Sequence, residues 1–396
     1  MTRVVLAGGI GVLLFLAYLT AIRPAFAVAY ALGGLLLLAW AWPRAAARGI
    51  RVHRSLDAGR ASVGEPFEET FSVQKGSAVP APWVEVQDLS GLRDYQPGRV
   101  VSLGKRPVIW SSQGVYQQRG RVHFGPTQVV VSEPFGLFRR QVRLEALDDV
   151  LVYPRIWPLP ELVVPASHHA GIAPRTGNWS DYPPESSGVR DYSPGDSFGR
   201  IHWALSHRHG RLMSKTFEQP LTADVWVVLD LDRGVHHGEG LESTLEYAIS
   251  LAASLCVQVQ EHGRQVGLIA TDDRATLIEP SRTGRKDRAL LDYLALCRAD
   301  GRLQLARAGV WEKLRRLPRR AVAVITPSAD PAWLGSLQSL QAPGTALIVF
   351  YLDACSFGAA GSNLSFDLGS ETELYVVRRG DDFSRLVSTR DAVRLV

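Results

Sequence analysis

Hydrophobic residues form two uninterrupted runs at the start of the chain. Residues 4–22 and 25–42 contain no charged side chain. Each run is close to the roughly 20 residues that a helix needs to cross the hydrocarbon core of a bilayer. Arg23 and Pro24 separate the two runs. The pattern therefore predicts a transmembrane helical hairpin within residues 1–49, with both of its ends on the same side of a membrane.

Two other interpretations of these runs are weaker. A basic start at Arg3 and the small-residue segment Ala25-Phe26-Ala27 are features of a cleaved signal peptide, but such a peptide is not followed directly by a second apolar run. A buried pair of core helices is disfavoured because neither run has a polar face.

Basic residues flank the predicted hairpin and give it an orientation. Four arginines follow the second run before the first acidic residue, Asp57: Arg44, Arg48, Arg51 and Arg54. The positive-inside rule then puts both termini and the remaining domains in the cytoplasm, at the inner (plasma) membrane. The three cysteines, Cys256, Cys297 and Cys355, are far apart, which fits a reducing compartment.

The pattern changes to short β-prone runs over residues 50–160. Turn sequences rich in Gly and Pro recur at roughly the 8 to 12 residue spacing that is typical of a β-sandwich or barrel. Phe67, Thr70 and Val73 do not alternate strictly, so the run at 67–73 is an imperfect strand pattern. We expect an all-β, sandwich-like domain that has no catalytic spacing of its own.

Residues 161–220 are rich in Pro and Gly and read as a linker that contains one dense polar segment at 187–212. The remainder, 221–396, alternates buried strands with amphipathic helices, which predicts an open, mostly parallel α/β sheet. The expected strands are 225–231, 266–270, 321–326 and 346–352, and the expected helices are 241–261 and 286–297. Ligands of such sheets bind at the carboxyl ends of the strands.

Composition and motifs exclude several function classes. The chain has 44 basic and 39 acidic residues, a net charge of +5, and it lacks the basic patches and motifs of nucleic-acid binding. Neither G-x-G-x-x-G nor G-x-x-x-x-G-K-[ST] follows the first α/β strand, and G-x-S-x-G is absent. These absences remove support for dinucleotide binding, nucleoside triphosphate binding and a nucleophile elbow.

The polar segment resembles the signature of the bacterial domain-of-unknown-function 58 (DUF58) family. Further segments that resemble the family are 119–126, 133–138 and 152–154. The signature positions that match in register, together with the arginine that follows, are Gly188, Arg190, Tyr192, Pro194, Gly195, Asp196, Arg200, His202, Trp203 and Arg208. Two roles for them stay open, a partner-binding site or an Arg–Asp lattice that fastens the linker.

The resemblance implies a C-terminal domain similar to a von Willebrand factor A domain. Such domains often hold a divalent cation with Asp-x-Ser-x-Ser after the first strand. The matching positions keep Asp230 but have Asp232 and Gly234 in place of the serines. Two carboxylates are suitable ligands for Mg²⁺, so Asp230 and Asp232 are the candidate metal ligands. Alternatively, they cap a turn and pair with nearby arginines.

Taken together, these features predict a membrane-anchored, non-catalytic adaptor or scaffold. The resemblance implies that it binds an AAA+ ATPase of the MoxR type and helps to assemble or remodel envelope complexes. The alternative is a metal-dependent hydrolase that uses Asp230, Asp232 and a histidine such as His202 or His236 to activate water. No triad or dyad spacing supports that alternative.

Overall fold

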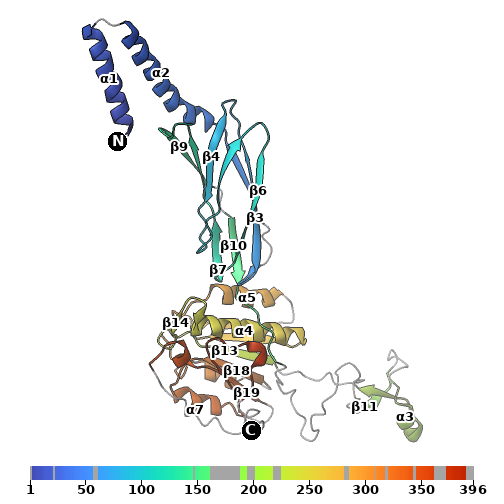
Figure 1. The fold of residues 1–396 in the computed structure, drawn as a ribbon. Helices are drawn as coiled ribbons and strands as arrows, with labels where there is room; N and C mark the ends of the chain where they lie inside the picture. The colour runs from blue at the N-terminus through green and yellow to red at the C-terminus, as the bar shows by residue number, and fades with distance from the viewer. Residues whose placement is uncertain are drawn as a thin grey trace. The chain divides into compact units, whose positions relative to one another are not determined.

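The fold is taken from a computed structural model. It describes residues 2–20, 23–56, 61–145, 148–160, 188–193, 201–216, 224–280, 285–307, 309–316, 320–341, 345–360 and 372–388. The chain divides into two compact units, Met1–Ile156 with Leu291–Cys297, and Trp157–Leu290 with Arg298–Val396. Each unit is described by itself (Figure 1).

Two apolar helices begin the first unit, α1 (Thr2–Thr20) and α2 (Arg23–Ala46). Within the described residues, α2 alone is both long and apolar enough to cross a membrane, whereas the apolar part of α1, Val4–Thr20, is shorter. The predicted runs therefore fold as helices, and one of them is a candidate membrane span.

The rest of the first unit is a β domain, as predicted. One sheet has the order β1-β3-β6, a second β5-β4-β8-β9 and a third β2-β10-β7. The strands are β1 (Arg51–Leu56), β2 (Ala61–Ser62), β3 (Pro66–Gln74), β4 (Ala81–Asp88), β5 (Gly98–Leu103), β6 (Val108–Val115), β7 (Gly120–Phe124), β8 (Thr127–Ser132), β9 (Arg139–Leu144) and β10 (Asp148–Tyr153). The first two sheets share one buried core, which contains Phe71 and Trp110 from one sheet and Val84 and Val129 from the other.

The burial of side chains along β3 explains why the sequence pattern at 67–73 is imperfect. The buried positions alternate regularly and are Phe67, Glu69, Phe71 and Val73. Glu69 occupies an inward position in the middle of the strand, so a polar residue interrupts the apolar series. The backbone of the strand is therefore regular. The sequence pattern is irregular because one core position carries a polar residue.

The second unit contains a six-stranded sheet of order β17-β16-β13-β18-β19-β20. All neighbours are parallel except β16 and β17, so the predicted open, mostly parallel sheet is confirmed. Its strands are β13 (Asp224–Leu229), β16 (Val266–Ala270), β17 (Leu277–Ile278), β18 (Arg320–Thr326), β19 (Ala346–Leu352) and β20 (Thr372–Val377). The helices are α4 (Thr244–Glu261), α6 (Val310–Arg315) and α7 (Ala332–Gln338), and α5 (Arg285–Leu296) is divided, since Leu291–Cys297 counts with the first unit.

Two element boundaries in the α/β region differ from those predicted from the sequence. The first strand, expected to reach residue 231, ends at Leu229, so Asp230 lies just beyond it. The helix expected from residue 241 begins at Thr244, because the Ser243 hydroxyl accepts a hydrogen bond from the Glu246 backbone N–H and caps the helix. Ser-x-x-Glu is a recognised sequence signal for such a helix start. A short hairpin, β14 (Gly238–Glu239) and β15 (Glu242–Ser243), precedes the cap.

Candidate functional site

Asp230 lies at the carboxyl edge of the six-stranded sheet, where the fold predicts a ligand site. It follows β13, and it is 1% exposed. In the register of the sheet, Leu229 is paired with Ala270 of β16 and with Ile325 of β18. The next residues on those neighbouring strands, Thr271 and Thr326, therefore lie on either side of Asp230.

Both threonine hydroxyls donate hydrogen bonds to the Asp230 carboxylate. Thr326 Oγ1 lies 2.7 Å from Oδ2, and Thr271 Oγ1 lies 3.1 Å from Oδ1. The Asp232 backbone N–H also donates to Oδ1, at 3.2 Å. Burial raises the pKa of Asp230, while these hydrogen bonds act in the opposite direction. The carboxylate thus ties together three neighbouring strands.

His236 extends this network to the Asp230 backbone and to Thr244 of α4. Its Nε2 lies 2.9 Å from the Asp230 backbone oxygen, and its Nδ1 lies 3.1 Å from Thr244 Oγ1. Because a carbonyl oxygen only accepts, Nε2 carries the hydrogen. Burial lowers the pKa of His236 to about 4, so the ring is neutral near pH 7. The histidine proposed to activate water is close to Asp230, but its ring nitrogens contact a backbone carbonyl and a threonine.

A small cavity of about 70 Å³ opens beside these residues. Asp232 lies half-buried at this edge, and its carboxylate accepts the Gly234 backbone N–H at 3.0 Å. The cavity is lined by Asp230, Asp232, Val235, Gln304, Leu305, Ala306, Ser328, Asp330 and Trp333.

The predicted cation site at Asp230 and Asp232 does not fit this arrangement. In the described part of the chain, no group of three or more His, Cys, Asp or Glu side chains could hold a metal ion. Three donors already occupy lone pairs of the Asp230 carboxylate, which leaves it about one free lone pair for an ion. The alternative, that both acids cap a turn and pair with arginines, is half right. Each carboxylate accepts the backbone N–H two residues on, but the side-chain partners of Asp230 are threonine hydroxyls.

The described part of the DUF58-like segment forms a strand, a helix and a strand. β11 (Gly188–Asp191) pairs antiparallel with β12 (Met213–Thr216), and α3 (Trp203–His209) lies between them in the chain. The buried Ser206 hydroxyl accepts the Met213 backbone N–H at 2.9 Å. Four signature residues lie outside the described residues: Pro194, Gly195, Asp196 and Arg200.

Other signature residues have local structural roles. Nδ1 of His202 accepts the Leu205 backbone N–H at 3.3 Å and so caps α3. Asp191 and Arg211, which lie within the polar segment but are not signature positions, form an exposed ion pair at 2.9 Å. Trp203, at the start of α3, is 64% exposed. His202, suggested above for hydrolysis, thus caps a helix, whereas Trp203 presents a large apolar surface that no described contact explains.

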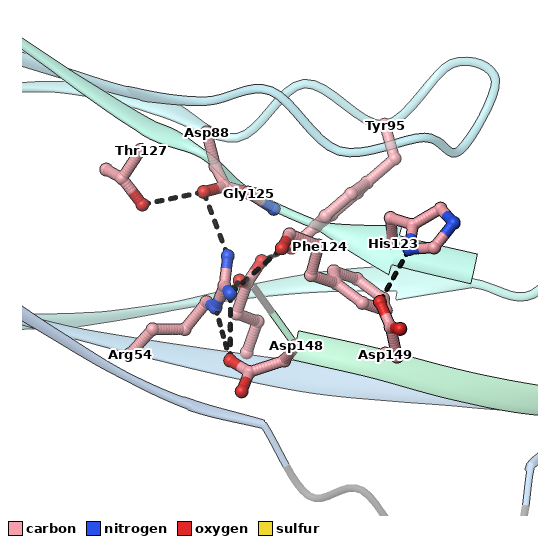
Figure 2. A network of polar contacts seen from close by, with 10 residues as sticks. Arg54, Asp88, Tyr95, His123, Phe124, Gly125, Thr127, Asp148 and Asp149 are labelled. Carbon is pink, nitrogen blue, oxygen red and sulfur yellow. Dashed lines mark hydrogen bonds and ion pairs between the residues drawn. The ribbon is translucent and has the colours of Figure 1, made fainter. Parts of the chain in front are cut away.

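A second buried polar cluster lies in the β domain, and sequence reasoning missed it. Arg54 of β1 points inward, with a side chain only 2% exposed. Figure 2 shows its guanidinium between Asp88, Asp148 and the Phe124 backbone oxygen. The distances are 3.1 Å to Asp88 Oδ1, 2.8 Å to Asp148 Oδ2 and 3.0 Å to the Phe124 oxygen. Arg54 was predicted to flank the membrane; instead it is a core cation.

Two fully buried carboxyl groups share this cation. Asp88 also accepts hydrogen bonds from Thr127 Oγ1 at 2.8 Å and from the Gly125 backbone N–H at 3.0 Å. Glu69 Oε1 lies 3.5 Å from Arg54 Nε, and its Oε2 accepts the Tyr95 hydroxyl at 2.8 Å. Burial raises the pKa of Glu69 to about 7. The only sequence signal was the break in alternation at Glu69.

Comparison with known proteins supports part of the resemblance. Residues 188–347 match the family described as "Protein of unknown function DUF58". The chain is 23% identical over 261 residues to "Uncharacterized protein YeaD" of Bacillus subtilis (strain 168), covering 64% of each chain. It is 27% identical over 194 residues to "Uncharacterized protein Rv1480" of Mycobacterium tuberculosis (strain ATCC 25618 / H37Rv), covering 47% of this chain and 58% of that one. The matches thus span less than two thirds of these relatives.

Two solved structures are similar to about a quarter of the chain. The CARDB domain of the PF1109 protein from Pyrococcus furiosus is 20% identical, with a TM-score of 0.20, and covers 26% of this chain and 91% of that one. The C-terminal domain of wzt is 10% identical, with a TM-score of 0.22, and covers 28% and 77%. At these TM-scores neither carries an argument about function.

Proposed function

We propose that this protein is a membrane-anchored, non-catalytic adaptor. The observation that carries the proposal is the junction between α2 and the β domain. Ala46, at the end of α2, is fully buried, and it belongs to the same core cluster as Phe71 and Val129. Trp42 Nε1 donates to the Pro80 oxygen at 3.1 Å. A candidate membrane helix that ends inside a domain core holds that domain at the membrane surface.

The proposed topology is the two-helix hairpin with both termini in the cytoplasm. α1 and α2 pack against each other. The apolar part of α1, Val4–Thr20, would extend about 26 Å as a helix, against a hydrocarbon core of about 30 Å. The exposed cations in the last turn of α2 and after it, Arg44, Arg48 and Arg51, favour the cytoplasmic side.

The Asp230 network favours a non-catalytic role. A general base or a metal ligand needs lone pairs directed at substrate or ion. The Asp230 carboxylate instead accepts from Thr271, Thr326 and the Asp232 backbone N–H. The von Willebrand factor A-like assignment belongs to this proposal and is supported by the parallel sheet with an aspartate after its first strand. We assign this unit a partner-binding role.

The proposed partner is an AAA+ ATPase of the MoxR type, and the proposed task is assembly or remodelling of envelope complexes. This part rests on the DUF58 match at 188–347 and on what that resemblance implies. The exposed Trp203 of α3 is our candidate contact, because exposed aromatic side chains are common energetic anchors of protein interfaces.

The test is affinity capture of the tagged full chain from detergent-solubilised native membranes, with ATP and Mg²⁺, with ADP and without nucleotide. We expect an AAA+ ATPase to be recovered in a nucleotide-dependent manner. Trp203→Ala should lower that recovery at least fivefold. Trp83→Ala is the matched control, because Trp83 of β4 is 50% exposed and lies outside the signature. Absence of an ATPase in every nucleotide state would overturn the proposed partner.

A further inference from the structure

A rigid turn in the β domain presents an exposed phenylalanine. Residues 133–138 join β8 to β9, and Phe135 is 64% exposed. Glu133 is 1% exposed, and its carboxylate accepts the backbone N–H groups of Phe135, Leu137 and Phe138. A buried carboxylate with three amide donors fixes the shape of a turn. The turn therefore holds an apolar side chain in solvent in a defined position.

This turn lies at the end of the β domain that α2 enters. Ser132 of β8 is paired with Trp83 near the start of β4, and the residue before β4, Pro80, accepts the Trp42 indole N–H. The β5–β6 turn, 104–107, is at the same end, because Leu103 is paired with Ala81. Figure 1 shows α2 meeting the domain where β4 begins and beside β9.

Close backbone packing fixes the junction. Gly49 has a φ of +73°, and a Cβ built on Gly76 would lie 2.9 Å from the Gly49 oxygen. The turn after α2 therefore lies directly against the turn after β3. Ile50 is also buried, in the same core as Ala46. The end of the domain around α2 is thus held by packing and not by a flexible linker.

The loops gathered at this end carry cations and hardly any acid. In the described segments 44–51, 74–80, 104–107 and 133–140, the one carboxylate is Glu133, which is buried within its own turn. Lys75 is half-buried, and its ammonium donates to the Val79 oxygen. The exposed cations at this end are Arg44, Arg48, Arg51, Lys105, Arg106, Arg139 and Arg140. We call these seven side chains and Phe135 the basic end.

We propose that the basic end docks on the anionic headgroups of the membrane that α2 enters, with Phe135 at the boundary with the acyl chains. This inference deepens the proposed function and rests on its membrane anchor. Clusters of Lys and Arg next to a membrane helix bind anionic lipid, and an apolar side chain among them inserts at the interface. The charge of the surface and its continuity with α2 select a lipid surface.

Trp40 and Arg44 fit the same interface. The Arg44 guanidinium lies 4.2 Å from the centre of the Trp40 ring, which is within the range of a cation–π contact. Trp and Arg at the end of a membrane helix are typical of the headgroup region. The last turns of α2 and the loops of the β domain therefore form one continuous surface of cations and aromatic rings.

The test uses the full chain in nanodiscs of phosphatidylcholine alone or with 30% phosphatidylglycerol. A fluorophore is attached at Ala78→Cys, in the exposed turn before β4, with Cys355→Ser to remove the cysteine that is not fully buried. Acrylamide, an uncharged quencher, measures how accessible the fluorophore is. We expect its quenching constant to fall at least twofold in the anionic discs and to recover in 0.5 M salt.

Matched variants separate this effect from net charge. Lys105→Glu with Arg106→Glu should abolish the difference between the two discs. Arg93→Glu with Arg121→Glu makes the same charge change on exposed residues away from the basic end and should preserve it. A fluorophore at Gln117→Cys, beyond the end of β6 that is remote from α2, should show no difference.

The outcomes distinguish this inference from the anchor on which it rests. A chain that enters both kinds of disc, yet shows equal quenching at residue 78, overturns the headgroup surface and leaves the anchor intact. The headgroup surface is also overturned if both double variants lose the quenching difference between the two discs equally, because net charge would then explain that difference. A chain that enters neither kind of disc overturns the anchor and this inference with it.

Discussion

The two units each bury an aspartate, and they stabilise it in different ways. In the β domain, Asp88 is 0% exposed and contacts the guanidinium of Arg54. In the α/β unit, Asp230 is 1% exposed and contacts two threonine hydroxyls. The first arrangement contains a full positive charge with more than one carboxyl group around it, whereas the second contains no cation among its described contacts.

This difference determines what each cluster can do. Three carboxyl groups surround Arg54, and one of them, Glu69, has a pKa raised to about 7 by burial. The charge of that cluster therefore changes near neutral pH. The Asp230 cluster is held by neutral donors, so its stability depends on hydroxyl geometry more than on charge. The predictions below test this contrast, from the largest expected effect to the smallest.

Removing the buried cation should have the largest effect. Arg54→Met leaves Asp88 and Glu69 buried without their counter-charge, and loss of one partner from a buried ion pair costs about 3–5 kcal/mol. Hydrogen exchange followed by mass spectrometry should show this loss in β-domain peptides and not in the α/β unit. Arg51→Met, an exposed arginine on the same strand, is the control. Equal effects of the two variants would contradict a core role for Arg54.

Removing the buried acid of the other unit should cost less. Asp230→Ala leaves the hydroxyls of Thr271 and Thr326 without their acceptor, and buried unsatisfied groups cost about 1–3 kcal/mol each. We expect hydrogen exchange to show a loss of about 3 kcal/mol in the opening free energy of peptides from β13, β16 and β18. Asp232→Asn, in the half-buried turn, should change stability by about 0.5 kcal/mol or less. Added Mg²⁺ should not shift the melting temperature of the wild type. A large stabilisation by Mg²⁺ would restore the predicted cation site.

The Glu69 carboxyl should give the β domain a pH dependence of defined sign. Its folded pKa, about 7, lies above its ordinary value of 4.5. Between these values the folded state holds a proton that the unfolded state has lost, so stability falls as pH rises, by at most about 1.4 kcal/mol per pH unit. Exchange of β-domain peptides should accelerate accordingly from pH 5 to 7.5 after correction for intrinsic rates. Glu69→Gln should flatten this slope, and an unchanged slope would assign it elsewhere.

The His236 ring should give the α/β unit a pH dependence of the opposite sign. Its folded pKa, about 4, lies below its ordinary value of 6.5. As pH falls below 6.5, the unfolded state gains a proton that the folded state does not, so stability falls with pH. Comparison of wild type with His236→Gln between pH 7 and 5 isolates this contribution, because Asp230 is retained in both. We expect the variant to lose less stability on acidification than the wild type.

The candidate sites differ in how far the sequence could predict them. Asp230 is predictable, because a buried strand followed by an acid identifies the carboxyl edge of a parallel sheet. Thr271 and Thr326 are not, since their approach to Asp230 depends on the strand order β16-β13-β18. Arg54 was misassigned to the membrane surface for a similar reason. Its sequence neighbours Arg48 and Arg51 are exposed, whereas pairing of β1 with β3 turns Arg54 toward Glu69.

The sequence by itself determined the order of the parts: apolar helices, then a β domain, then an α/β unit. That order follows from local patterning, because hydrophobic periodicity and turn residues act over a few neighbours in the chain. Only the tertiary structure decided which charges are buried and which are displayed. Arg54 enters the core, while Lys105 from the β5–β6 turn and Arg139 from the start of β9 join Arg44 at the basic end. Strand register sets both outcomes, and register depends on contacts between residues that are distant in sequence.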